Sequence, residues 1–481
     1  MQRTRRALMN PDRADRGILA LITLALCAVA PLTAVGCSFE DPLAMLDGER
    51  PAKSRDLGPP KRVFAKRFVT PIRSAPSPDS ARLGYLRAGA LLSSTTTEPL
   101  GYEGCEAGWY ELDTGGFACN ERDIIVFSGE RLPELRARQP DLSAAMPYEY
   151  ATVRRKTPLY KRIPKADEVY EVPAEPMDAG VESATAVEPA PPPVEIDSPL
   201  VLRILQPGFY VSLDRKFERD AASYWRTQQN GFVPAERLRR KEWSEFRGQT
   251  LDGREWTLPV AVVRGESTTV YRLNNRGRLK AGRGLLEPRT WLRVHSRRRI
   301  DGNVYLLVGD GRLVQENEVM VIEPIAPPEG VGEGQRWIDV DLARQVLVAY
   351  DWNQPRYVTL MSSGRTRTPR PELSYLTPKG LHRIRGKHLT STMDNDEPGE
   401  PPYSLEDVPY VMYFRGAYAF HSAFWHDRFG RPRSHGCINL APWDAKWLYN
   451  WAGPDLPPGW HGGSATDENP GTWVWVHGET P

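Results

Sequence analysis

Proline and glycine recur along the whole chain at spacings too short for long helices. The 481-residue sequence contains 44 Pro and 40 Gly, and most apolar runs between them are only a few residues long. Pro lacks a backbone N–H and Gly favours turns, so neither residue suits a helix interior. Together with 14 Trp and 19 Tyr, the pattern predicts short strands and turns around aromatic cores. The expected fold is mainly β, and a helical bundle is disfavoured.

Length and charge narrow the function classes. The chain is too long for one hydrophobic core, so roughly three or four domains are expected. Lys and Arg number 63 while Asp and Glu number 61, which leaves a formal net charge of +2. A dedicated nucleic-acid binder would carry a strongly basic total, so no nucleic-acid partner is expected. Five Cys are too few for a scaffold built on disulfides.

Residues 1–37 have the layout of an export signal. Basic residues come first, an apolar run from Ile18 to Leu32 follows, and small residues precede Cys37. The layout resembles a bacterial lipoprotein signal, in which Cys37 becomes the lipid-modified first residue. That resemblance implies an exported protein of the periplasm or cell envelope, held to a membrane by its lipid. Ser38 would favour the outer membrane of a Gram-negative cell. A cleaved secretion signal and an uncleaved anchor are the alternatives.

Export affects the interpretation of Cys105 and Cys119. The two residues are 14 positions apart in Gly-rich surroundings. Nearby thiols usually pair in an oxidising compartment, so a disulfide is expected here. Two buried thiols acting as small hydrophobes are the alternative.

A weak repeat follows a polar tether at residues 38–60. Its copies span 61–128, 150–240 and 255–325, and each combines short strands, a Gly-containing turn and a similar acidic ending. Such spacing is typical of small β-barrels, and the first copy resembles bacterial SH3-like modules. Residues 172–199 are rich in Pro and acids, which predicts a disordered insertion in the second copy. The modules could bind a ligand or act as spacers.

Residues 335–479 have a different sequence pattern from the repeat. Apolar and polar residues alternate over 337–342 and 345–350, as in a hairpin. A second hairpin is predicted from 411 to 421 with its turn at Gly416, and a helix from Pro442 to Asn450. Residues 386–402, rich in Gly, Pro and Asp, are expected to form part of a mobile cover.

Cys437 and His421 are the candidates for chemistry. A thiol attacks an amide carbonyl as the thiolate, and a neighbouring imidazole can take its proton and later give it to the leaving amine. We expect His421, at a hairpin end, to meet Cys437 on a strand-to-helix turn. His435 and Gly436 would then offer backbone N–H groups as an oxyanion hole. A nearby helix start would lower the pKa of the thiol.

The arrangement of these residues is similar to the signature of the L,D-transpeptidase (YkuD-type) catalytic domain. The signature consists of His421, the intervening residues Ser422–Arg433, and then Ser434-His435-Gly436-Cys437-Ile438-Asn439. Two further segments also match the family, Thr377-Pro378-Lys379-Gly380 and Gly471-Thr472-Trp473-Val474. The resemblance implies a β-rich sandwich behind two or three SH3-like barrels. It also implies a reaction: Cys437 attacks a peptidoglycan stem tetrapeptide, releases D-Ala, forms a thioester and transfers the acyl group to an amine.

The same resemblance assigns roles to the residues. His421 is the base, Ser422 orients it through its carbonyl, and His435 and Gly436 border the oxyanion hole. Ser434 and Asn439 contact the substrate, and Asn439 stands where many members have Arg. No metal or organic cofactor is implied. The acceptor is a second stem peptide or a protein amine.

Three alternatives stay open. Water could resolve the thioester, which would make the protein an L,D-carboxypeptidase or another peptidoglycan hydrolase. A non-catalytic wall-binding protein could keep the fold for adhesion. A zinc hydrolase could use a site formed by His421, His426, His435 and Cys437.

Overall fold

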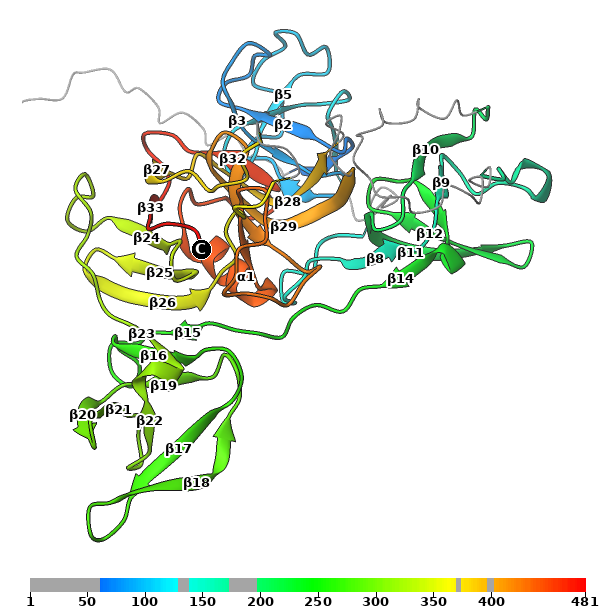
Figure 1. Cartoon of the computed structure of the whole chain (residues 1–481). Helices are drawn as coiled ribbons and strands as arrows, with labels where there is room; N and C mark the ends of the chain where they lie inside the picture. Colours follow the sequence, from blue (N-terminus) through cyan, green and yellow to red (C-terminus); the bar gives the residue numbers. More distant parts are fainter. Residues whose placement is uncertain (1–60, 129–137, 173–196, 369–372, 396–401) are drawn as a thin grey trace, which may run out of the picture. The chain divides into compact units, whose positions relative to one another are not determined.

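The protein is described by a computed structural model that covers residues 61–128, 138–172, 197–368, 373–395 and 402–481 (Figure 1). The predicted signal, the tether and nearly all of the predicted insertion lie outside these residues. Strands dominate, so the mainly β prediction is confirmed. Within the described residues, no helix combines the length and the apolar character needed to cross a membrane.

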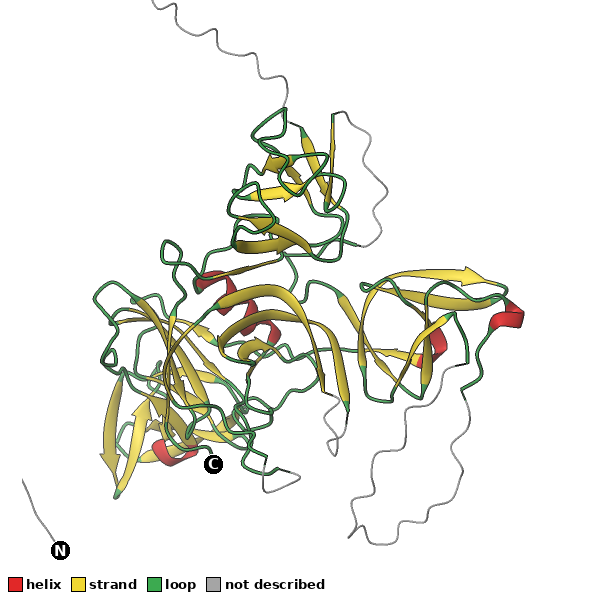
Figure 2. Ribbon diagram, turned by 90° about the horizontal axis from the view of Figure 1, so that it is seen from above, coloured by secondary structure: helices red, strands yellow, loops and turns green. Residues whose placement is uncertain are grey.

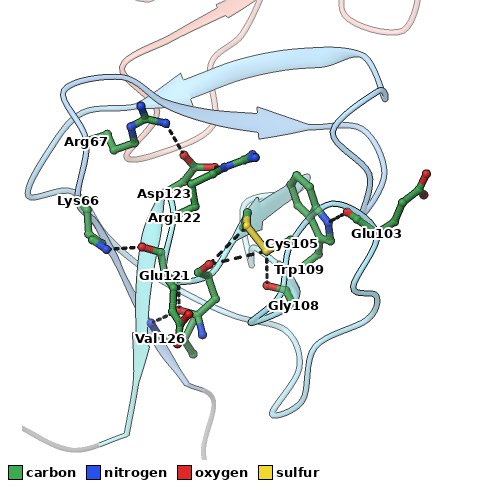
Figure 3. The surroundings of a disulfide bond; sticks show 12 residues. Lys66, Arg67, Glu103, Cys105, Gly108, Trp109, Glu121, Arg122, Asp123 and Val126 are labelled. Atoms are coloured by element: carbon green, nitrogen blue, oxygen red, sulfur yellow. Dashed lines mark hydrogen bonds and ion pairs between the residues drawn. A yellow bond between two sulfur atoms is a disulfide. The ribbon is translucent and has the colours of Figure 1, made fainter.

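The first module consists of seven strands over residues 62–127. Its core contains Val63, Ile72, Leu86 and Tyr110. A disulfide joins Cys105 to Cys119 and lies against the buried ring of Trp109, whose Nε1 donates to the carbonyl of Glu103 at 2.7 Å (Figure 3). The strands are β1 (Arg62–Ala65), β2 (Thr70–Arg73), β3 (Arg82–Leu86), β4 (Leu91–Ser93), β5 (Trp109–Glu111), β6 (Phe117–Cys119) and β7 (Ile124–Phe127).

The second and third modules are also built from strands, with short 3₁₀ turns. The second has β8 (Glu149–Val153), β9 (Thr157–Tyr160), η1 (Ala166–Glu168), β10 (Val201–Leu205), β11 (Tyr210–Arg219), β12 (Ala222–Thr227), β13 (Phe232–Pro234), η2 (Ala235–Arg237) and β14 (Leu238–Arg240). The third has β16 (Val260–Val263), β17 (Thr268–Leu273), β18 (Leu279–Leu286), β19 (Trp291–Arg293), β20 (Ser296–Ile300), β21 (Asn303–Leu307), β22 (Leu313–Gln315), η3 (Glu316–Glu318) and β23 (Val319–Ile322).

The three modules repeat one strand arrangement. In each, the opening strand lies antiparallel between a central strand and the final strand: β1 between β4 and β7, β8 between β11 and β14, and β16 between β19 and β23. In the second and third modules a 3₁₀ turn leads directly into that final strand. The weak sequence repeat thus corresponds to a structural repeat, while its SH3-like character stays a prediction.

The C-terminal domain packs two sheets and one helix around a shared core. The first sheet has the order β15-β26-β25-β24-β33-β27, and the second contains β28 to β32. Helix α1 (Pro442–Trp451) lies against the second sheet, with Pro442 at its first position (Figure 2). The strands are β24 (Arg336–Asp341), β25 (Val346–Asp351), β26 (Gln354–Leu360), β27 (Gly380–Arg383), β28 (Gly386–Asn395), β29 (Tyr403–Arg415), β30 (Tyr418–Ser422), β31 (Ile438–Leu440), β32 (Gly462–Ser464) and β33 (Trp473–His477), and β15 (Gln249–Thr250) is supplied by the preceding connection.

The segment expected to form part of a mobile cover contains a regular strand. Residues 386–395 form β28, which pairs with β29 along most of its length, and a role of the segment as a cover stays a prediction. Gly386 opens β28, whereas the other Gly and the Pro residues of the segment fall at 398–402, mostly outside the described residues.

The C-terminal domain is bonded to its neighbours through sheet edges and a buried ion pair. Strand β3 pairs with β32, and β15 pairs with β26. The Arg87 guanidinium donates to both carboxylate oxygens of Asp407, at 2.5 and 3.1 Å, and the Ser212 hydroxyl donates to the same carboxylate at 2.6 Å. Asp407 lies in β29 and is only 1% exposed. Its buried carboxylate therefore forms hydrogen bonds with one residue of each of the first two modules, Arg87 and Ser212.

Candidate active site

The candidate catalytic residues are brought together by a parallel pair of strands. Strand β30 pairs with β31 so that His421 lies opposite Asn439 and Phe420 opposite Ile438. Side chains alternate between the faces of a strand, and paired residues share a face. Phe420 and Ile438 point into the domain core. His421 and Asn439 therefore occupy the opposite face, together with Cys437, two residues before Asn439.

His421 is held in a single tautomer. Its side chain is 3% exposed, and its Nδ1 lies 3.1 Å from the backbone carbonyl oxygen of Ser422. A carbonyl only accepts, so Nδ1 carries the proton and Nε2 is left as the basic nitrogen. Burial lowers the pKa of His421 to about 4, although the bond to Ser422 acts in the opposite direction. The imidazole is neutral at physiological pH and can receive a proton.

Cys437 is a partly buried, protonated thiol. Its Sγ lies 3.7 Å from the carbonyl oxygen of Ala417, and its side chain packs against a cluster that includes Ala419 and Trp425. Burial raises the pKa of the thiol to about 11, while the backbone N–H of Ala419 acts to lower it. The expected helix-start effect is absent because β31 lies between Cys437 and α1, which begins at Pro442. The prediction of a lowered thiol pKa is wrong for the resting protein.

The turn before Cys437 is closed by its own polar groups. The backbone N–H of Gly436 donates to the Ser434 hydroxyl at 2.9 Å, and that hydroxyl donates to the Cys437 carbonyl at 2.6 Å. Gly436 has φ of +120°, and a Cβ at this position would collide with the ring of Tyr418. The Gly436 N–H and the Ser434 hydroxyl, predicted to face the substrate, are thus engaged within the turn.

Asn439 lies on the floor of the site. It is 3% exposed, and its backbone forms two hydrogen bonds of 2.9 Å with Ser362. Its side-chain amide contacts His426, with 3.1 Å between Nδ2 and Nε2. From the sequence alone, His426 was indicated only as a ligand of the zinc alternative. Among the described residues no group of three or more His, Cys, Asp or Glu side chains could hold a metal, so the four residues of that alternative do not converge.

Comparisons with known proteins identify the family that the C-terminal domain matches. Residues 335–476 match the family model of the L,D-transpeptidase catalytic domain (YkuD). The chain carries an L,D-transpeptidase catalytic domain. The search of curated proteins finds no match.

Solved structures of L,D-transpeptidases are also similar to the chain. The enzyme from Stackebrandtia nassauensis is 22% identical over 31% of this chain and 58% of that chain, with a TM-score of 0.22. The catalytic domain from E. faecium is 24% identical over 30% of this chain and 98% of that chain, with a TM-score of 0.23. The L,D-transpeptidase from Mycobacterium smegmatis is 16% identical over 53% of this chain and 91% of that chain, with a TM-score of 0.22.

Aromatic rings of the L,D-transpeptidase domain surround the two predicted histidines. Trp425 stacks on His421 with 5.7 Å between ring centroids. His435 is exposed, and its ring lies 4.3 Å from that of Tyr375 and 5.5 Å from that of Tyr403. The Arg365 guanidinium approaches the His435 Nε2 at 2.9 Å. No sequence pattern indicated these neighbours, although Trp425 follows His421 by only four residues.

Proposed function

We propose that the protein is a peptidoglycan L,D-transpeptidase in which Cys437 is the nucleophile and His421 the general base. The observation that carries the proposal is the register of β30 and β31, which sets a thiol and a neutral imidazole on one face of an L,D-transpeptidase domain. The bond from His421 Nδ1 to the Ser422 carbonyl supports this role because it leaves Nε2 free to accept the thiol proton.

The proposed reaction proceeds in two half-reactions. His421 Nε2 takes the proton of Cys437 as the thiolate attacks the carbonyl between the diamino acid and the terminal D-Ala of a stem tetrapeptide. The C–N bond breaks, His421 returns the proton to the leaving D-Ala amine, and a thioester remains. The amine of a second stem peptide then attacks the thioester and loses its proton to His421. A new amide forms, and the proton returns to the Cys437 sulfur.

The charge state of the pair fits proton transfer during the attack. Burial disfavours both the thiolate and the imidazolium, so the resting pair is neutral. An arriving substrate has to supply the interactions that make the transfer favourable. The proposal therefore places ionisation in the substrate complex and not in the free protein.

Location and acceptor are further parts of the proposal. Cys37 at the end of the signal-like segment supports lipid anchoring in the cell envelope, where peptidoglycan is found. The amine acceptor is proposed to be a second stem peptide or a protein. Cys37→Ser should move the protein from the membrane fraction to the soluble exported fraction, because stable attachment needs the acyl chains. Unchanged fractionation would contradict anchoring through Cys37.

Incubation with purified disaccharide-tetrapeptide tests the reaction. We expect cross-linked dimers and released D-Ala by mass spectrometry, together with an acyl-enzyme adduct at Cys437. Cys437→Ala should fold and form neither product nor adduct. Free tripeptide without dimers would instead identify an L,D-carboxypeptidase. An adduct that persists in Cys437→Ala would refute the assignment of the nucleophile.

A further inference from the structure

Positive charge is concentrated in one part of the third module. The whole chain has a net charge of +2, but residues 268–300 contain ten Lys and Arg and a single acid, Glu287. These residues include strands β17, β18, β19 and β20. Charges of one sign at this density repel one another and weaken the compact state. A partner of opposite charge therefore explains the concentration better than folding does.

Most of these cations have no carboxylate partner. Three arginines of the segment form ion pairs with acids elsewhere in the chain, namely Arg289, Arg293 and Arg297. Within the described part of the chain the other seven cations form no ion pair, and all of them are exposed: Arg272, Arg276, Arg278, Lys280, Arg283, Arg298 and Arg299. Five of the seven lie on the hairpin of β17 and β18, so the uncompensated charge is greatest there.

The β17–β18 hairpin projects from its module. Strand β18 is the edge strand of the described sheet, and only its first and last residues are partly buried. Figure 1 shows the hairpin extending beyond the other strands of the module. Its turn is closed by Asn274, whose Oδ1 accepts the backbone N–H groups of Arg276 and Arg278 at 2.9 and 3.0 Å. Gly277 supplies the positive φ, +70°, that the turn requires. The tip is thus a preformed structure.

Two leucines flank the tip of the hairpin. Leu273 and Leu279 are register partners, so their side chains share one face, while the next pair, Arg272 and Lys280, shares the opposite face. Leu273 is 36% exposed, and neither leucine is part of the hydrophobic core of the module. The tip therefore presents apolar side chains on one face and cations on the other face and in the turn.

We propose that the tip of this hairpin, residues 271–281, is a docking surface for an anionic phospholipid bilayer. A bilayer surface has lipid phosphates above an apolar layer, which suits cations next to exposed leucines. The guanidinium groups bind the phosphates through their planar fork of N–H donors, and Leu273 and Leu279 enter the boundary between headgroups and acyl chains. A partner that offers only carboxylates would leave both leucines in water. The proposal depends neither on the chemistry of Cys437 nor on lipid modification of Cys37.

Vesicle co-sedimentation tests the proposal. The full chain carrying Cys37→Ser, which cannot be acylated at that position, is mixed with vesicles of phosphatidylcholine alone or of equal parts phosphatidylcholine and phosphatidylglycerol. The ratio of the two Kd values isolates the charge-dependent part of binding, because apolar contacts made by residues 18–32 act on both kinds of vesicle. We expect tighter binding to the anionic vesicles, and a preference that falls as salt is added.

Substitutions at the tip separate the charged from the apolar contribution. Each Lys or Arg near an anionic surface contributes about a factor of five in affinity. Arg276→Ser, Arg278→Ser and Lys280→Ser combined should therefore lower the preference for anionic vesicles about 100-fold. Leu273→Ser combined with Leu279→Ser should instead weaken binding to anionic vesicles about tenfold and leave its salt dependence unchanged, because the apolar contact is lost and the charges remain.

The matched control removes the same charge from the turn between β8 and β9 of the second module. Arg154→Ser, Arg155→Ser and Lys156→Ser combined should keep the preference for anionic vesicles. An equal loss in this control would assign the effect to net charge and overturn the proposal. Equal binding of the parent chain to both kinds of vesicle would also overturn it. The same holds if the tip variant lost binding to purified peptidoglycan sacculi but not to vesicles.

Hydrogen exchange followed by mass spectrometry locates the contact without a substitution in the hairpin. Anionic vesicles should protect the backbone amides of residues 271–281 in the Cys37→Ser chain and leave those of residues 154–156 unchanged. Protection that spares residues 271–281 would overturn the proposal even if the tip variants lost binding through misfolding.

Discussion

The neutral resting pair predicts how the Cys437 thiol reacts with pH. Burial raises its pKa from 9.0 to about 11. A shift of two pKa units lowers the thiolate fraction at pH 7.5 about 100-fold, since each unit is a factor of ten. A more basic thiolate is intrinsically more nucleophilic, with a Brønsted slope of about 0.4–0.5, which returns roughly a factor of eight. Cys437 should therefore react about tenfold more slowly than an exposed cysteine.

Exchange with dithiodipyridine, followed by absorbance, measures this rate. The rate constant of Cys437 is the difference between the wild-type chain and Cys437→Ala, which removes the contribution of other thiols. This rate constant should rise about tenfold per pH unit from pH 6 to pH 9, because the pH stays well below the pKa of the Cys437 thiol throughout this range.

His421→Gln separates a general base from an ion-pair partner. In a neutral resting pair the histidine does not stabilise a thiolate, so the variant should keep the pH profile of dithiodipyridine exchange. Its acylation by disaccharide-tetrapeptide should still slow by about 10²–10⁴-fold, the usual contribution of a general base. A plateau of the exchange rate between pH 6 and 8 in the wild type, lost in His421→Gln, would show a resting thiolate–imidazolium pair and refute this reasoning.

Three further predictions concern stability. Arg87→Met should lower the free energy of unfolding by about 3–5 kcal/mol in urea titrations, because it leaves the buried Asp407 carboxylate without its cation. Arg62→Met is the control: Arg62 is partly exposed and its side chain contacts the ring of Phe127, so its loss should lower the free energy of unfolding much less. Burial lowers the pKa of His388, His421 and His426 to about 4 and that of His461 to about 3, so their contribution to stability is full above pH 6.5 and is lost as the pH falls towards 4. Raised pKa values act with the opposite sign at Glu406 (about 8), Asp444 (about 6), Asp339 and His477, so the net loss of stability between pH 7 and pH 5 should be smaller than the four histidines alone would give. Equal unfolding free energies at pH 7 and pH 5 would contradict the neutral histidines. Reduction of the Cys105–Cys119 disulfide, whose cysteines are 14 residues apart, should lower the free energy of unfolding by about 3 kcal/mol. Thermal melting with and without reductant measures this loss, and Cys105→Ser should melt like the reduced wild type.

Local patterns were sufficient to predict much of the fold and of the site. The Val260–Val263 run forms β16, and the hairpin expected around Gly416 is formed by β29 and β30. These elements depend on alternation and turn residues, which a sequence displays directly. The placement of His421 and Cys437 followed from a signature that spans both residues.

Properties that depend on distant residues could not be predicted. The raised pKa of Cys437 arises from burial by β29, β30 and Trp425, whereas the sequence displayed only a helix a few residues away. His426 was indicated only as a ligand of the zinc alternative, because its contact with Asn439, 13 positions further on, depends on how the chain folds. The ion pair of Arg87 with Asp407 joins residues 320 positions apart, and no local pattern encodes it.

The ion pair and the shared sheet edges also determine where the chain can be cut. The family signature begins at residue 335, but a fragment that starts there would lose the strands paired with β26 and β32, and its Asp407 would be buried without Arg87 and Ser212. An uncompensated carboxylate and two newly open sheet edges favour aggregation. The cooperative unit of unfolding is therefore larger than the unit of sequence homology. If a fragment of residues 335–481 were insoluble or inactive, the cause would be the loss of the neighbouring modules, and the result would not test the chemistry of Cys437.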